Sequence, residues 1–303
     1  MELNVVVIGD IGIRAPDSVI KQNVVRAIEL QHQERPFRLG INLGGNEYPH
    51  GSAKNEFINL RWIFELSFPV SMFPFDFLTV PGAVDYQGDV ATQIKYHWEE
   101  HRFYMPQKNY YYGLEFSDID VVLRDRTSIR FVCIDSTPLY ETRVCKNIIN
   151  RVTRLNRFIQ LEETERLLDN SVGFDFVFLI MHHNVVDGCG PHTFVPNDLP
   201  FMKVIKHRRL AAILTAYNHN MQIHGRLVLR PPVITVGNSA QTEPVTYSNT
   251  PLSYKNSVIS RWCKSPQSGG YGQLIISKQS VWFNFIDGNG EIIHQETINP
   301  VQG

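Results

Sequence analysis

Several features that often reveal a protein's class are scarce or missing in this sequence. Only four of the 303 residues are cysteine, and Cys133, Cys145, Cys189 and Cys263 stand far apart, with no Cys-x-x-Cys pair. This scatter excludes a small disulfide-built scaffold and a zinc-finger type of cluster. We therefore expect free thiols and a reducing compartment, with one disulfide as the alternative.

Long apolar runs and an excess of either charge are also missing. Val5–Ile8 is too short for the apolar region of a signal peptide, and no later stretch approaches the roughly 20 apolar residues that span a bilayer. The 29 basic and 30 acidic residues give a net charge of -1. Such a balance offers no long-range attraction to polyphosphate. We expect a soluble, cytoplasmic protein with no nucleic-acid partner and no membrane span.

What is present is the composition and patterning of a globular α/β protein. Apolar residues make up 43% of the chain and charged residues 19%. Up to residue 215, short apolar runs alternate with segments of helical spacing. Strands are expected over Val5–Ile8, Leu39–Leu43, Phe77–Val80, Val121–Leu123, Ile129–Ile134, Phe174–Met181 and Ala211–Thr215, and helices over Ser18–Gln33, Asn55–Leu66, Val90–His101, Asn147–Asp169 and Leu199–Arg209.

After residue 220 the pattern changes to strands alone. The expected strands are Ile223–Leu229, Val233–Val236, Leu274–Ser277, Val281–Phe285 and Ile292–Glu296, and Thr242–Gly270 is expected to be one long polar loop. Alternating βα units followed by β-only units predict a layered α/β sandwich with strands from both parts of the chain. No linker interrupts the pattern, so we expect one domain over residues 1–303.

Ligands of a parallel α/β sheet gather at the carboxyl ends of its strands, so the segments after the strands are informative. Five of them are Gly9–Gly12, Leu43–Tyr48, Val80–Tyr86, Ile180–Asn184 and Ala216–Gln222. In this order and spacing they resemble the five metal-binding blocks of the metallophosphoesterases, above all the small purple acid (tartrate-resistant) phosphatases. The resemblance covers nearly the whole chain and implies an αββα sandwich, with two mixed sheets flanked by helices.

The resemblance also implies which functional positions are kept and which are lost. Active members carry Gly-Asp-x-Gly, Gly-Asp-Asn-x-Tyr, Gly-Asn-His-Asp, a His after a strand, and Gly-His-x-His, and they hold two metals about 3.5 Å apart. This chain keeps the positions of Asp10, Tyr48, His182 and His219. It has Gly45 at the bridging Asp, Ala83 at the Asn ligand, Val84 at the phosphate-facing His and Tyr217 at the first His of the last block. The segment Asp187–His192 aligns with the family's substrate-side loop.

These losses predict that this chain lacks the two-metal phosphoesterase chemistry of the family. A second metal would keep His182 alone, and one imidazole does not hold a dication against water. The first would keep Asp10, Tyr48 and His219, with Tyr a ligand only as tyrosinate. We therefore expect no cofactor, or at most one weakly bound metal ion.

Two classes of function follow, with a third alternative. The first is a non-catalytic purple acid phosphatase-like pseudoenzyme, a structural scaffold or protein-interaction module among other proteins of a larger assembly. This loss of residues in the second and third blocks resembles that in the glideosome-associated purple acid phosphatase-like proteins of apicomplexan parasites. Those proteins are membrane-tethered anchors. Since this chain shows neither leader nor tether, we expect a cytoplasmic assembly, with a cytoskeletal one such as an axoneme as a candidate. The second is a residual one-metal phosphoesterase hydrolysing phosphate monoesters, and the third is a small-ligand sensor.

Overall fold

A computed structural model gives the fold and describes residues 2–113, 123, 126–140, 150–185, 189–190, 204, 210–225, 231–246 and 259–298. Among these residues, the helices are the 3₁₀ turn η1 (Ala15–Asp17), α1 (Val19–Glu34), α2 (Ile58–Leu60), the π-helical η2 (Arg61–Glu65), the 3₁₀ turn η3 (Val84–Gln87), α3 (Val90–Glu99), α4 (Thr137–Tyr140) and α5 (Asn150–Asp169). The expected helix Leu199–Arg209 and strand Val121–Leu123 fall almost wholly outside the described residues.

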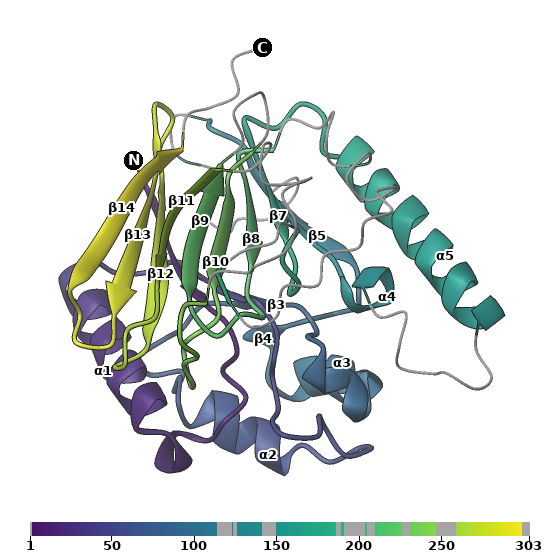
Figure 1. Ribbon diagram of the computed structural model, residues 1–303, viewed down its shortest axis with the longest axis horizontal. Helices are drawn as coiled ribbons and strands as arrows, with labels where there is room; N and C mark the ends of the chain where they lie inside the picture. The colour runs from purple at the N-terminus through teal and green to yellow at the C-terminus, as the bar shows by residue number, and fades with distance from the viewer. Residues whose placement is uncertain are drawn as a thin grey trace.

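The strands form two seven-stranded mixed sheets, which confirms the predicted αββα sandwich (Figure 1). The first has the order β14 (Ile292–Ile298), β13 (Val281–Asp287), β12 (Gly270–Ile276), β1 (Leu3–Ile8), β2 (Leu39–Asn42), β3 (Phe77–Thr79) and β4 (Phe103–Tyr104). The second has the order β11 (Ile259–Lys264), β9 (Met221–Gly225), β10 (Val233–Val236), β8 (Ala212–Thr215), β7 (Phe176–Ile180), β6 (Ile129–Cys133) and β5 (Tyr110–Gly113).

Strands from both parts of the chain share each sheet, as the sequence predicts. β1 pairs in parallel with β2 and antiparallel with β12, where Val5 lies opposite Leu274. One expectation is wrong: residues 259–264, placed in the polar loop, form β11 at the edge of the second sheet, paired with β9. The assignment of residues 1–303 to a single domain stays a prediction.

The core lies between the sheets and beneath the helices of the second sheet. In β6 and β7 successive side chains point to opposite faces, so Phe131 and Phe178 join the inter-sheet core while Val132 and Leu179 join the core under α4 and α5. Figure 1 shows α1, α2 and α3 on one outer side and α5 on the other. Two rigid sheets covered in this way fix the loops at the ends of their strands.

Candidate functional site

The loops that follow the strands of both sheets meet at one edge of the sandwich. Asp10 follows β1, and its backbone N–H donates to the carbonyl oxygen of Gly44, which follows β2. In the second sheet, the N–H of Ala216 after β8 donates to the carbonyl of His182 after β7. The structure therefore brings the sequence-predicted segments into one site.

Asp10 is fully buried at the centre of this site, and both of its carboxylate oxygens accept hydrogen bonds from the protein. The Tyr48 hydroxyl donates to Oδ1 at 2.7 Å, and the backbone N–H of Tyr217 donates to Oδ2 at 3.0 Å. His219 Nε2 lies 3.6 Å from Oδ1. Burial raises the pKa of Asp10, but His219, together with His182 and the Tyr48 hydroxyl, outweighs burial, and the pKa is lowered overall. Asp10 is thus an ionised group stabilised by protein partners.

His219 supplies the positive charge of this arrangement. Its Nδ1 lies 3.1 Å from Glu243 Oε1, and its Nε2 lies 3.1 Å from the Tyr48 hydroxyl and 2.9 Å from the side-chain amide of Gln241, which turns its oxygen toward a protonated ring. Burial acts to lower the pKa of His219, but Asp10 and Glu243 outweigh it and raise the pKa to about 9. The ring is therefore an imidazolium near neutral pH, flanked by two carboxylates.

Sequence reasoning missed Gln241 and Glu243. Both lie after β10, in or beside the segment expected to be a polar loop, and they reach His219 from 22 and 24 positions along the chain. The local sequence does not distinguish Gln241 from other loop residues. For Glu243, the only indication was that an acidic side chain can pair with the retained His219.

Gly45, at the position of the family's bridging Asp, has a backbone conformation that favours glycine. Its φ is +71°, and a Cβ there would overlap Asp10 Oδ1 and lie 3.1 Å from Asp10 Cα. The carboxylate of Asp10 thus occupies the space into which a side chain at position 45 would extend. No metal-bridging group fits at this position without displacing Asp10.

Tyr217, at the position of a lost His, contacts the retained histidine as well as Asp10. Its ring lies edge-on to His182, with centroids 5.5 Å apart, and tilted against His183 at 4.6 Å. The φ of Tyr217 is 75°, and Asp10 and His219 also have positive φ, at 53° and 48°. Positive φ in bulky residues stores strain that persists only where the surrounding structure imposes it.

In the third segment, Val80–Tyr86, the structure assigns a structural role to Asp85, while Ala83 and Val84 stand where the resemblance predicts that an Asn ligand and a phosphate-facing His are lost. Ala83 and Val84 offer no donor, whereas Asp85 is fully buried and accepts from the backbone N–H groups of Asn46 and Gly82 at 3.0 and 2.7 Å. Gln93 on α3 donates to the same carboxylate. Asp85 therefore fastens the loops after β2 and β3 to each other.

The residues present do not fit the two-metal centre that the fold implies. Positions 45 and 83 carry no ligand atom, and Asp10 is already engaged by Tyr48 and Tyr217. Burial and then the Asp10 charge raise the pKa of Tyr48 well above its ordinary value, which opposes the tyrosinate that a metal would need. His182 alone has a ligand-like orientation, with Nδ1 2.8 Å from the carbonyl of Leu43. Whether one metal binds at Asp10, Tyr48, His182 and His219 stays a prediction.

Two expectations outside this cluster are corrected or left untested. The expectation of free thiols is wrong for Cys189 and Cys263, which form a disulfide across 74 positions, with Cα atoms 6.3 Å apart. The pairing of β11 with β9 places Cys263 near Cys189, and the sequence around either cysteine does not predict this pairing. Cys133 is free and buried. Cys145 and most of the loop Asp187–His192 lie outside the described residues.

The chain matches no family model and no curated protein in sequence. It does resemble solved structures. GAP50, described as the anchor in the inner membrane complex of Plasmodium, superposes with a TM-score of 0.78 at 15% identity, over 99% of this chain and 90% of GAP50.

Two other solved structures superpose less closely. The purple acid phosphatase PPD1 from yellow lupin (Lupinus luteus) seeds has a TM-score of 0.66 at 14% identity, over 99% of this chain and 54% of the lupin enzyme. PhoD has a TM-score of 0.58 at 10% identity, over 98% of this chain and 68% of PhoD. Together with the two mixed sheets and their flanking helices, these likenesses show that the chain has a metallophosphoesterase-like fold.

Proposed function

We propose that this chain is a non-catalytic metallophosphoesterase-like protein that acts as a structural scaffold or protein-interaction module in a larger assembly. The observation that carries the proposal is the state of Asp10. Its Oδ1 accepts from the Tyr48 hydroxyl, its Oδ2 accepts from the backbone N–H of Tyr217, and His219 lies beside it as the counter-charge. A protonated imidazole thereby balances the carboxylate whose counterpart in the active family faces a metal ion.

Two further observations support the scaffold part of the proposal. GAP50, described as an anchor, shares the fold over 99% of this chain. Apolar side chains are also exposed on neighbouring elements. Ile58 on α2, Trp62 on η2 and Leu66 directly after η2 follow one another at intervals of four residues. Trp98 on α3 is exposed as well. The ion pair between Arg61 and Glu99 at 3.5 Å joins these elements. Where exposed apolar side chains form one contiguous patch, they are typical of protein-binding surfaces.

Metal analysis combined with a phosphatase assay tests the non-catalytic part. Purified protein is expected to carry well under one equivalent of iron, zinc or manganese at this site and to hydrolyse phosphate monoesters no faster than Asp10→Ala protein. Two tightly held metals per chain, or turnover that Asp10→Ala abolishes, would overturn the proposal.

Affinity purification from the native source tests the scaffold part. Proteins that co-purify with the wild type should be lost with the double variant Trp62→Ser/Trp98→Ser. They should be retained with Val172→Ser, since Val172 is 82% exposed beyond the end of α5 and away from these elements in the sequence. Equal recovery with all three proteins would count against this surface as the scaffold's contact.

A residual one-metal phosphoesterase is the second candidate, favoured by one observation. Asp10 Oδ1, the Tyr48 hydroxyl and His219 Nε2 converge within 2.7 to 3.6 Å of one another. Chelator-sensitive turnover together with a single bound metal would identify this activity. The same assay therefore separates the two candidates.

The location of the protein is part of the proposal. Among the helices that the structure describes, none is both long and apolar enough to cross a bilayer. We keep a cytoplasmic assembly, cytoskeletal or axonemal, as the proposed setting, but the Cys189–Cys263 disulfide is a bond typical of oxidising compartments. A cytosolic protein would hold this pair reduced. Differential alkylation of protein from its native source, read by mass spectrometry, distinguishes the two states.

A further inference from the structure

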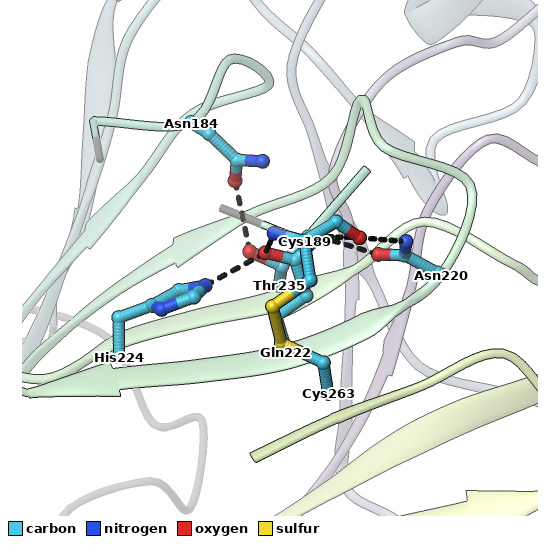
Figure 2. Close-up of a disulfide and its surroundings, with 7 residues drawn as sticks. All are labelled: Asn184, Cys189, Asn220, Gln222, His224, Thr235 and Cys263. Carbon is cyan, nitrogen blue, oxygen red and sulfur yellow. Dashed lines mark hydrogen bonds between the residues drawn. A yellow bond between two sulfur atoms is a disulfide. The ribbon is translucent and has the colours of Figure 1, made fainter. Parts of the chain in front are cut away.

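A second cluster of metal-ligating side chains surrounds the disulfide, away from Asp10. Cys189 follows β7, His224 lies on β9 and Cys263 lies on the edge strand β11 (Figure 2). The two Sγ atoms and a ring nitrogen of His224 all lie within 4.8 Å of one another. Cys189 and His224 are each only 2% exposed. Three segments distant in sequence thus contribute one ligand atom each.

The protonation of His224 is fixed by its neighbour Gln222. The Gln222 amide nitrogen donates to the Cys189 carbonyl and to Asn220 Oδ1, while its Oε1 accepts from the Cys189 backbone N–H at 3.1 Å. Because Oε1 is an acceptor, His224 Nε2, 2.7 Å away, must donate to it. Figure 2 shows this network, in which Gln222 links His224 to the cysteine segment.

This arrangement leaves His224 in the form that binds metals. Nδ1 keeps its lone pair and has no hydrogen-bond partner among the described residues. Metal-binding histidines commonly donate one ring N–H to a carbonyl or carboxylate oxygen, which holds the ring in place and sets its tautomer.

The ligand set is one that zinc uses. Two thiolates and an imidazole, with water in a fourth position, suit Zn²⁺, at about 2.3 Å from sulfur and 2.0–2.1 Å from nitrogen. Ligand atoms in such a tetrahedron lie about 3.5–3.8 Å apart, so binding requires the two sulfurs to separate and the His224 ring to turn its Nδ1 toward them. We propose that, when the Cys189–Cys263 disulfide is reduced, the two thiolates and His224 bind one Zn²⁺, which then links β11 to the segment after β7.

The chemistry of the exchange balances with a thiol reductant. A dithiol, such as a reduced disulfide-exchange protein, gives two electrons and two protons to the S–S bond and is itself oxidised to a disulfide. Binding of Zn²⁺ to the two cysteine thiols then releases their two protons to water. The edge strand therefore stays tied to the rest of the second sheet in both redox states.

The test uses the full chain, reduced with a phosphine, desalted without oxygen and titrated with Co²⁺ and then Zn²⁺. We expect one equivalent of Co²⁺ to produce thiolate-to-cobalt charge-transfer absorption, which Zn²⁺ abolishes. The oxidised protein should show no such band. A metal at Asp10, Tyr48 and His219 would lack thiolate and could not give this signal, so the readout is independent of the proposed function.

Variants assign the ligands. His224→Gln should weaken Zn²⁺ binding at least tenfold, while His101→Gln, at an exposed histidine, and Cys133→Ser, at the buried free thiol, should leave it unchanged. A charge-transfer band missing from the reduced wild type, or persisting in Cys189→Ser/Cys263→Ser, would overturn the proposal. If reduction unfolds the chain, refolding on addition of Zn²⁺ supports it, and failure to refold refutes it.

Discussion

At the residue scale, the site contains one buried negative charge, on Asp10, and one positive charge, on His219. Asp10 is fully buried and would be costly as an isolated charge, because burial removes its hydration. Tyr48, the Tyr217 backbone and His219 together compensate for that loss. Protein groups therefore compensate the Asp10 charge, and each of these groups should affect the stability of the fold.

Replacement of Asp10 by Asn should lower the free energy of unfolding by about 2–4 kcal/mol at neutral pH. The amide cannot accept from both Tyr48 and Tyr217, and it leaves the His219 charge with Glu243 alone. Urea denaturation measures the change. Asp17→Asn is the control: its carboxylate is half-exposed and paired with Arg14, so the loss should not exceed about 1 kcal/mol. Equal effects of the two substitutions would mean that Asp10 is solvated.

Stability should fall as the pH rises from about 6.5 to 9. The pKa of His219 is about 9 in the folded protein and about 6.5 in the unfolded chain, so its contribution is complete below pH 6.5 and is lost as the pH rises through 9. The difference corresponds to about 3 kcal/mol. The pKa of Asp10 is lowered, so its own contribution is lost only in acid.

The pH dependence is checked by urea denaturation of the wild type and His219→Gln between pH 6 and 10. The wild type should lose stability across this range, and the variant should lose most of that slope. Parallel curves for the two proteins would show that His219 does not carry the charge.

Gly45 provides a separate test of crowding at the site. Gly45→Ala should lose about 1 kcal/mol because φ is positive, and about 1–3 kcal/mol more because its Cβ would meet Asp10. Gly290→Ala is a matched control, since Gly290 also has positive φ but a Cβ there would meet no atom within 4 Å. The difference in unfolding free energy between the two variants measures the crowding, and no difference would mean that Asp10 moves aside.

At the scale of elements, α1 secures the chain segment that carries Asp10. Ser18 precedes the helix and caps it by accepting from the Lys21 N–H at 3.0 Å. The Lys21 ammonium is buried and donates to the carbonyl oxygens of Ile11, Ile13 and Ile63. One side chain thereby joins α1, the loop after β1 and η2.

Lys21→Met should destabilise the protein by about 2–3 kcal/mol, because the two buried carbonyl oxygens of Ile11 and Ile63 and the half-buried one of Ile13 would lose their donor. Thermal or urea unfolding measures it. Lys95→Met on α3, where the exposed ammonium bonds only the Asn55 side chain in the described contacts, should change stability by less than about 0.5 kcal/mol. A comparable loss for both would mean that Lys21 contributes through its alkyl chain.

At the scale of the whole molecule, the chain has a metallophosphoesterase-like fold, but positions 45, 83 and 84 carry no metal-ligating side chain. The quadruple variant Gly45→Asp, Ala83→Asn, Val84→His and Tyr217→His restores the named ligands. We expect it to fold with reduced stability, to bind some metal and to hydrolyse phosphate esters poorly. Gly45→Asp must displace Asp10, and Tyr217→His removes a ring packed against His182 and His183. Metal analysis and a phosphomonoesterase assay check this, and wild-type-like stability with efficient turnover would contradict it.

The amino-acid pattern alone was enough to predict the layered fold, and it shows that positions 45, 83 and 84 carry no metal-ligating side chain. Both are local properties: alternation of apolar runs sets the strands and helices, and the residue at position 45, 83 or 84 is Gly, Ala or Val in any conformation. It also indicated that Asp10 needs a partner, because a buried carboxylate must be compensated.

The partners of Asp10 and His219 and the pairing of Cys189 with Cys263 depend on tertiary contacts. Glu243 and Gln241 reach His219, and Cys189 reaches Cys263, through the pairing and packing of strands far apart in the chain. Such contacts depend on how two sheets close on each other, and the residues flanking each partner carry no record of that closure. This is why β11 and the cysteine–histidine cluster emerged only from the folded chain.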